Sequence, residues 1–193
     1  MSWLHLTEKV DDSEHASVFD VVACFRKERA LLFRFAFLIT GDKTAAEQSL
    51  INACEMTIKG HSPFRDWLTE WAKVATVTHA VLHCISAIRG CEALYEGQQC
   101  THAEHLSQGD EANLEQALRV ILQTDPEILI DQVDALSRAV LVLRVAIRSS
   151  IHECVLRLNV SRTAVIAANC RAMMWIEQVQ LKPSQQLIKD CII

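Results

Sequence analysis

Imidazole and thiol side chains, the types best suited to metal chemistry, gather between residues 79 and 105. His79 and His83 lie four residues apart on one face of a predicted helix, and Cys84 follows directly. Four more such residues come next: Cys91, Cys100, His102 and His105. Imidazole nitrogens and thiolates are zinc ligands. The spacing of the second group matches no standard zinc finger, and half-exposed histidines with unpaired thiols are the alternative. We therefore expect no metal site.

The sequence contains no pattern that predicts catalysis. It has no nucleophile–base motif, no glycine-rich phosphate loop and no paired catalytic carboxylates. Ser149 and Ser161 fall at predicted caps or turns, where a serine hydroxyl needs no catalytic role. We expect a protein that is not an enzyme and that carries no cofactor.

A predicted helix-turn-helix within residues 137–175 is the strongest functional signal. Residues 151–158 place apolar side chains at i, i+3, i+4 and i+7, which predicts a short helix. Asn159 tolerates the left-handed conformation of a sharp turn. Ser161 can cap the next helix through its hydroxyl. The second helix of such a unit enters the DNA major groove.

Polar side chains on this last helix are the predicted DNA contacts: Arg162, Thr163, Asn169 and Arg171. Asparagine pairs with adenine and arginine with guanine. Ile166 and Ala168 offer only methyl groups, for a thymine or for another protein. The alternative is that Val165, Ala168 and Ala172 are core residues at helical spacing. In that case Arg162 and Arg171 are ordinary solvated surface.

Composition predicts the class of fold that must position these residues. Half of the 193 residues are hydrophobic, five are glycine, three are proline, and aromatic residues make up 6%. Few helix breakers and no long alternating stretch predict an all-α protein. The predicted helices span 15–39, 44–59, 64–88, 111–123, 126–135, 137–147, 151–158 and 162–182. In the third of these, Phe64, Trp67, Leu68 and Trp71 are expected to face the core, and Pro183 is expected to end the last.

Two helical domains are expected, at residues 14–89 and 113–182, joined by a flexible linker at 90–112 and followed by a tail at 183–193. The net charge of −5 is unevenly distributed. Residues 90–134 contain one arginine and ten acidic residues, a net charge of −9, whereas residues 135–182 contain seven basic and two acidic residues, a net charge of +5. No apolar run approaches the ~20 residues that span a bilayer. No signal peptide is visible. A cytoplasmic protein with no membrane partner is therefore expected.

Several segments, in order, resemble extracytoplasmic-function (ECF) bacterial sigma factors. Residues 31–42 (LLFRFAFLITGD) are similar to the family's LYRFAYRLTGD, and residues 64–68 (FRDWL) to FRAWL. Residues 133–144 (VDALSRAVLVLR) resemble LPxxxRAVLVLR, and residues 160–165 match IS-xx-TV. The resemblance implies a helical promoter-melting domain, a linker and a helix-turn-helix domain. It also implies core RNA polymerase and promoter DNA as partners, with no cofactor.

The chain departs from this family at contact positions. The positions that match the family's polymerase-binding run are Glu47, Gln48, Ile51 and Asn52, where amides replace acidic residues and so weaken charge-assisted contacts. Beyond residue 70, the third helix keeps Lys73 and Arg89 as fixed positive charges for promoter DNA. Because phosphate neutralisation dominates affinity, fewer basic residues mean weaker binding.

Two hypotheses follow from these departures. The first is a sigma factor that binds core RNA polymerase and directs initiation at a promoter. The second is a degenerate sigma-like protein that has lost DNA binding and acts as a protein-interaction or regulatory module. In the second, the acidic linker could fold over the basic C-terminal portion and mask it. An anti-sigma factor or another regulator is a possible further partner.

Overall fold

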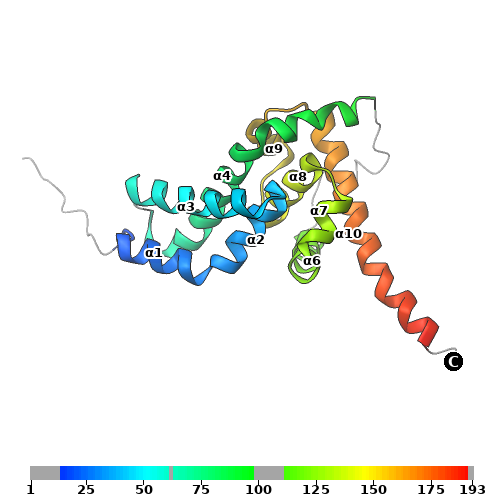
Figure 1. Ribbon diagram of the computed structural model, residues 1–193, viewed down its shortest axis with the longest axis horizontal. Helices are drawn as coiled ribbons and strands as arrows, with labels where there is room; N and C mark the ends of the chain where they lie inside the picture. Colours follow the sequence, from blue (N-terminus) through cyan, green and yellow to red (C-terminus); the bar gives the residue numbers. More distant parts are fainter. Residues whose placement is uncertain (1–13, 61–62, 98–110, 191–193) are drawn as a thin grey trace, which may run out of the picture.

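A computed structural model describes residues 14–60, 63–97 and 111–190, with the side chains of 181–190 outside the description. The described residues form helices and no strand, which confirms the all-α prediction (Figure 1). Residues 98–110 of the predicted linker and 191–193 of the predicted tail lie outside the described residues.

The prediction of one continuous helix over residues 15–39 is wrong. Helix α1 (Val18–Lys27) and helix α2 (Arg29–Thr40) are separate. The chain leaves helical geometry at Glu28, with φ −90° and ψ 5°. Ser17 and Asp20 form a capping box that starts α1 at Val18. On the two sides of the break, Phe25 and Leu32 enter the same small buried cluster. Because residues seven apart also share a face of an unbroken helix, helical periodicity does not reveal the break between them.

The next elements confirm the local signals. Gly41 follows α2 with a left-handed φ of 68°, and the Asp42 carboxylate accepts a hydrogen bond from the Ala45 N–H at the start of α3 (Lys43–Lys59). A short 3-10 helix, η1 (Arg65–Trp67), precedes α4 (Leu68–Gly90). Helix α4 kinks at Cys84, whose thiol donates to the carbonyls of Ala80 and Ile39.

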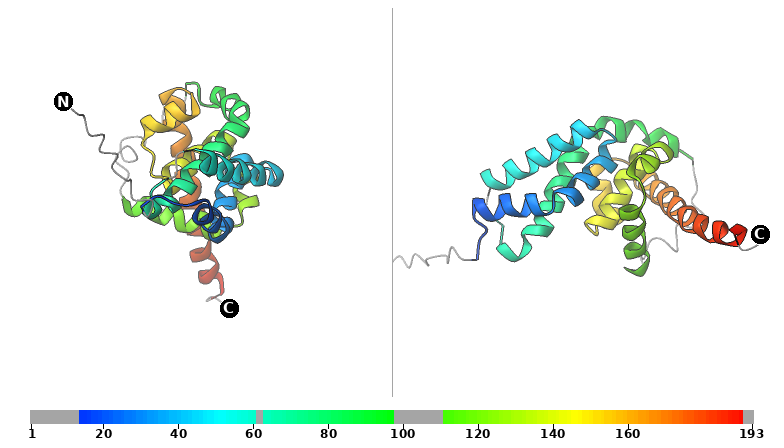
Figure 2. Two further views of the ribbon diagram at one scale, coloured as in Figure 1. Left: turned by 90° about the vertical axis from the view of Figure 1, so that its left-hand side faces the viewer. Right: turned by 60° about the horizontal axis from the view of Figure 1, so that its bottom comes forward.

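The second half of the chain builds the remaining helices. A 3-10 helix, η2 (Glu92–Tyr95), lies in the predicted linker. It is followed by α6 (Glu111–Gln123), α7 (Pro126–Gln132), α8 (Ala135–Ala146), α9 (Ile151–Leu158) and α10 (Arg162–Asp190). The expected stop at Pro183 is wrong, because α10 continues to Asp190 and projects beyond the other helices (Figure 2). The missing proline N–H costs one backbone hydrogen bond. Good helix formers such as Gln, Leu and Lys flank it.

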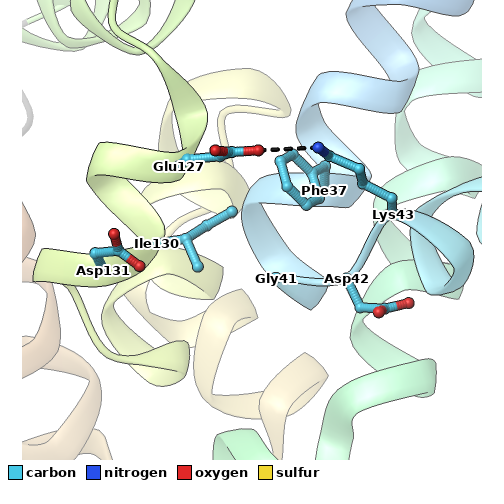
Figure 3. A pocket seen from close by; sticks show the side chains of 7 residues that line it. All are labelled: Phe37, Gly41, Asp42, Lys43, Glu127, Ile130 and Asp131. Atoms are coloured by element: carbon cyan, nitrogen blue, oxygen red, sulfur yellow. Dashed lines mark hydrogen bonds and ion pairs between the residues drawn. The ribbon is translucent and has the colours of Figure 1, made fainter.

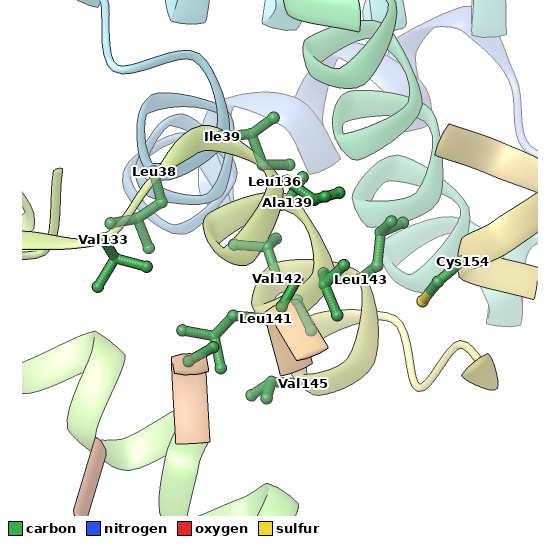
Figure 4. Packing of buried hydrophobic residues seen from close by; sticks show 14 of the residues in the cluster. Leu38, Ile39, Val133, Leu136, Ala139, Leu141, Val142, Leu143, Val145 and Cys154 are labelled. Atoms are coloured by element: carbon green, nitrogen blue, oxygen red, sulfur yellow. The ribbon is translucent and has the colours of Figure 1, made fainter. Parts of the chain in front are cut away.

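The larger buried cluster contains residues from both halves of the chain. Figure 4 shows Leu38 and Ile39 of α2 beside Leu136 and Ala139 of α8. Helix α4 contributes Val77, Ala80 and Val81, and α10 contributes a run up to Ile176: Ala164, Val165, Ala167, Ala168, Ala172, Met173, Trp175 and Ile176. A second, smaller cluster lies within residues 16–72. The expected arrangement of two helical domains with separate cores is therefore not confirmed.

Two arginines tie the halves together through helix ends. Arg34 of α2 donates to the carbonyls of Ile121 and Thr124, at the C-terminal end of α6. Arg138 of α8 is 8% exposed and donates to the carbonyl of Leu38, near the C-terminal end of α2, at 2.8 Å. Each guanidinium thus supplies positive charge where the helix dipole is negative and where carbonyls lack partners. These contacts fix how the two halves meet.

Helix α4 with its preceding 3-10 turn also bears on the membrane expectation. By length and hydropathy, residues Arg65–Gly90 include a window long and apolar enough to cross a bilayer, with mean hydropathy 1.2, and 33% of that window is buried in the fold. By composition, therefore, the chain does contain a segment long and apolar enough to span a bilayer, contrary to the expectation from the sequence. Core helices pass the same test, and α4 contributes Val77, Ala80 and Val81 to the shared core.

Candidate nucleic-acid and protein interfaces

The helix-turn-helix is built by the signals that predicted it. Helix α9 spans the predicted residues, and a capping box joins Ser150 and Glu153 at its start. Asn159 ends it in the left-handed conformation, with φ 51° and ψ 52°. The Ser161 hydroxyl accepts from the Ala164 N–H at 3.3 Å and caps α10. The helix–turn–helix geometry at residues 151–176 is therefore confirmed locally.

Helix α10, the second helix of the helix-turn-helix, is buried on two faces. Val165, Ala168 and Ala172 are fully buried, as the core alternative predicts. The face that a free helix-turn-helix would present is also covered, since Ala167, Cys170 and Met173 are only 6%, 6% and 9% exposed. Elements η2 and α6 pack against α10 in addition to α8 and α9. Helix α10 is thus part of the interior between residues 164 and 176.

The predicted DNA contacts on α10 are separated by this burial. Arg162 and Thr163 are exposed at the start of the helix. Arg171 is exposed, but its Nε lies 3.6 Å from an Asp134 carboxylate oxygen. Asn169 is 4% exposed, so its amide cannot reach a base edge as the chain is folded. Of the four residues, the structure leaves Arg162 and Thr163 together at one surface.

An acidic side chain occupies the start of α10. The Ser161 N–H donates to Glu92 Oε1 at 2.7 Å. This backbone hydrogen bond, with help from the Ser161 hydroxyl and the charge of Arg89, lowers the pKa of Glu92. Helix N-termini bind anions, and phosphate would approach DNA-binding helices there. Glu92 therefore supplies from within the chain the negative charge that DNA would bring.

The two predicted DNA contacts on α4 lie far apart. Arg89 acts on Glu92, close to the start of α10. Lys73 pairs with Glu70 at 2.7 Å, and its side chain is 21% exposed. Sixteen residues of helix separate the two positions, a distance of roughly 24 Å. Arg89 thus joins Arg162 and Thr163 at one surface, and Lys73 does not.

The four predicted polymerase contacts form one stripe on α3. Glu47, Gln48 and Ile51 are exposed, with Ile51 at 51%, and Asn52 is half-buried. Gln48 Nε2 donates to Asn52 Oδ1 at 2.9 Å, as residues four apart on a helix can. The opposite side of α3 is core, where Ala46 and Ala53 are fully buried. The stripe is available to a partner.

Aromatic residues at the start of α4 were placed wrongly by the sequence. Phe64, Trp67 and Trp71 were expected in the core but are 49%, 72% and 48% exposed. Leu68, the residue next to Trp67, is the one that is buried, at 6% exposure. No sequence signal was available for finding these exposed rings, because helical spacing does not say whether another element covers a stripe.

These rings form a small aromatic surface, which consists of Phe64, Trp67 and Trp71. The Phe64 and Trp67 ring centres are 6.4 Å apart. Trp71 Nε1–H donates to Thr57 Oγ1 at 3.3 Å, which places the Trp71 ring beside the end of α3. A hollow of about 420 Å³ lies next to it, lined by Glu14, Phe64, Arg65, Asp66 and Trp67.

A second hollow, of about 370 Å³, lies where the two halves meet (Figure 3). Lys43 crosses it to reach Glu127 of α7 at 2.9 Å, and its ammonium lies 5.7 Å from the centre of the Phe37 ring. The Lys43 ammonium gains its raised pKa mainly from the Glu127 hydrogen bond. The remaining lining residues are Gly41, Asp42, Ile130 and Asp131. The ion pair crosses the hollow from one half of the chain to the other.

No three potential metal ligands come together among the residues that the structure describes. His79 is half-buried and His83 is exposed. Cys100, His102 and His105 lie outside the described residues. Five cysteines carry free thiols (Cys24, Cys54, Cys84, Cys91 and Cys154), whereas Cys170 is disulfide-bonded. The zinc alternative gains no support from the described part of the chain.

Comparison with protein-family models, with curated proteins and with solved structures finds no match to this chain.

Proposed function

We propose that this chain is a sigma-factor-like protein that binds core RNA polymerase through the exposed stripe of α3 and that, in its folded state, withholds its helix-turn-helix from promoter DNA. The observation that carries this proposal is the burial of residues on opposite faces of α10: Val165, Ala168 and Ala172 on one face, and Ala167, Cys170 and Met173 on the other. A protein folded in this way is a protein-interaction module first, and its role is regulatory rather than catalytic.

Charge supports weak DNA binding. At the start of α10, Glu92 accepts the Ser161 N–H beside the exposed Arg162, and its charge interacts with that of Arg89. Arg171 is paired with Asp134. Since each phosphate neutralised by a free cation adds to DNA affinity and to its salt dependence, paired cations predict weak binding with a shallow salt slope.

Binding to core RNA polymerase tests the proposal directly. Purified full-length protein is titrated against labelled core enzyme, together with Ile51→Lys on α3 and Leu82→Lys on α4. Leu82 is a matched control, because it is a similarly exposed apolar residue, at 61%, on another helix. We expect binding that Ile51→Lys weakens at least tenfold and that Leu82→Lys leaves unchanged. Absence of binding by the wild type overturns the proposal.

A mobility shift with promoter-length duplex at low salt tests the second half of the proposal. We expect weak, sequence-independent binding. Tight, salt-sensitive binding to one sequence would instead favour an initiating sigma factor.

Promoter opening by such an initiating factor is the second candidate function, and one observation favours it. The aromatic surface at Trp67 and Trp71 offers exposed rings on which unpaired bases can stack. It lies in the stretch that resembles the promoter-melting domain. Transcription by core enzyme from a promoter library, with wild type and Trp67→Ala, checks it: no promoter-dependent transcript rules it out.

A further inference from the structure

The 3-10 helix η2 bonds to α10 and to its supports at two separated points. Glu92, its first residue, accepts the Ser161 N–H at the start of α10. Tyr95, its last residue, is 2% exposed. The Tyr95 hydroxyl donates to Asp134 Oδ2 at 2.5 Å and lies 2.6 Å from Ser137 Oγ. Asp134 in turn holds Arg171 of α10. Through these bonds η2 reaches both Ser161 and Arg171.

The covered face of α10 lies between those two points. Ala167 and Cys170, on the side that a free helix-turn-helix exposes, are buried, and η2 is among the elements that pack against α10. Arg157 of α9 also approaches Thr78 of α4, at 3.4 Å. The helix-turn-helix is therefore held against the first half of the chain by side-chain contacts around its edge.

We propose that η2 is an autoinhibitory strap: its Glu92 and Tyr95 contacts hold α10 closed, and their release frees the start of α10, with Arg162 and Thr163, for a polyanion such as duplex DNA. This inference goes beyond the proposed function because it says how DNA binding by α10 is regulated. It rests on the proposed function only for the choice of DNA as the ligand. A 3-10 helix of four residues has few contacts of its own, so it belongs among the parts of a fold that open locally.

The strap is tested by hydrogen exchange on the full-length protein, with Glu92→Ala and with Glu92→Ala combined with Tyr95→Phe. Tyr95→Phe keeps the buried ring and removes the hydroxyl bonds. Glu96→Ala is the matched control, because Glu96 is exposed and lies four residues further along the same segment. A reducing agent is present throughout, so that the Cys170 disulfide does not hold α10 independently.

We expect amides of residues 162–173 to exchange at least fivefold faster in the double variant, with a smaller increase in Glu92→Ala and none in Glu96→Ala. Amides of α2 and of residues 140–146 of α8, which lie beyond the Tyr95 contacts, should be unchanged. Unchanged exchange in 162–173 overturns the strap. Equal acceleration in α2 and in residues 140–146 also overturns it, because that result reports general destabilisation.

Binding of a fluorescent 30-base-pair duplex of arbitrary sequence at low salt gives the second readout. The double variant should bind at least fivefold more tightly than the wild type. Faster exchange without tighter binding overturns autoinhibition and leaves η2 as a structural brace. Polymerase binding is measured on the same samples, so that failure of the proposed function appears as lost polymerase binding, whatever the exchange and DNA results.

Discussion

At the scale of single residues, Arg138 does the most to join the two halves. Its guanidinium donates to the carbonyls of Leu38, Ile130 and Val133 at 2.8, 3.2 and 2.6 Å. A Cβ at Gly41 would lie 3.2 Å from Arg138 Nη2, so this corner is also tightly packed. One side chain thus satisfies carbonyls at the ends of two helices that are far apart in sequence.

Arg138→Met should lower the free energy of unfolding by about 3 kcal/mol, because it leaves buried carbonyls without donors while keeping much of the side-chain volume. Urea denaturation followed by circular dichroism measures the change. Arg148→Met is the control, since Arg148 is exposed. Equal stability of Arg138→Met and wild type would contradict the role assigned to these bonds.

Asp134 is a second residue whose effect is measurable, through pH. Burial acts to raise its pKa, but hydrogen bonds from Tyr95 and Ser137 and the charge of Arg171 outweigh burial and lower the pKa. A carboxylate whose pKa is lower in the folded than in the unfolded protein stabilises the fold while it is ionised. This stabilisation is complete above the unfolded pKa of about 4, and it is lost as the pH falls through the folded pKa.

Asp134→Asn should therefore cost about 1–2 kcal/mol of unfolding free energy at pH 7, where charge-assisted hydrogen bonds are lost. Asparagine can still cap α8, so the helix itself should persist. The difference from wild type should shrink below about pH 4. Denaturation curves at pH 7 and pH 3 check this, and a difference that grows at pH 3 would have the wrong sign.

At the scale of single residues, the sequence predicted the features that depend on neighbours in the chain, such as turns and helix caps. Asn159 and Ser161 were predicted from the turn and cap that they form. The burial of Asn169 was not predicted, because it depends on elements that pack against α10 from distant parts of the chain. No spacing rule within residues 162–171 carries that information.

At the scale of elements, the start of α4 shows the difference between periodicity and burial. Helical spacing places Trp67 and Trp71 on one stripe but does not say whether another element covers it. Trp67→Ala should change stability by less than about 0.5 kcal/mol, because the ring is 72% exposed. Leu68→Ala should cost about 2–4 kcal/mol, because Leu68 is buried in the smaller cluster. Thermal unfolding of both variants compares them, and a larger loss at Trp67 would contradict the observed packing.

Helix boundaries were predictable where caps marked them. Asp42, Asp125 and Ser150 each accept a backbone hydrogen bond at a predicted helix start. The break at Glu28 was missed because its neighbours are ordinary helix formers. The proline at 183 gave a false stop, because one lost hydrogen bond need not end a long helix.

At the scale of the whole molecule, the shared core decides how the protein unfolds. Residues of α2 and α4 supply part of the surface on which α8 and α10 pack. Full-length protein should unfold in one cooperative step. A fragment of residues 112–193 should be largely unfolded, because its core residues lose their partners from the first half.

Circular dichroism and urea titration of that fragment beside the full chain check this prediction. A fragment with residues 14–97 is the useful comparison, because it retains the smaller cluster intact and should keep some helix. A cooperative unfolding transition in 112–193 would show that the second half is independent after all.

The two-domain expectation is not confirmed, and the reason also lies at the scale of the whole molecule. The polar, glycine-containing stretch after Gly90 has the composition of a linker. No sequence pattern in either half of the chain indicates that its apolar residues pack against the other half. Leu38 and Leu136 look like residues of two separate cores, but they belong to one buried cluster (Figure 4). The polymerase and DNA roles of the predicted site residues stay predictions.

The shared core also has a consequence for synthesis on the ribosome. Leu38 and Ile39 emerge early, whereas their neighbours in the finished core extend to Ile176. At 5–20 residues per second, the intervening chain takes roughly 7–27 s to make. Throughout that interval the nascent first half carries uncovered apolar surface and is a natural client for chaperones. Translation that stops within the second half should therefore release an aggregation-prone product rather than a shorter stable protein.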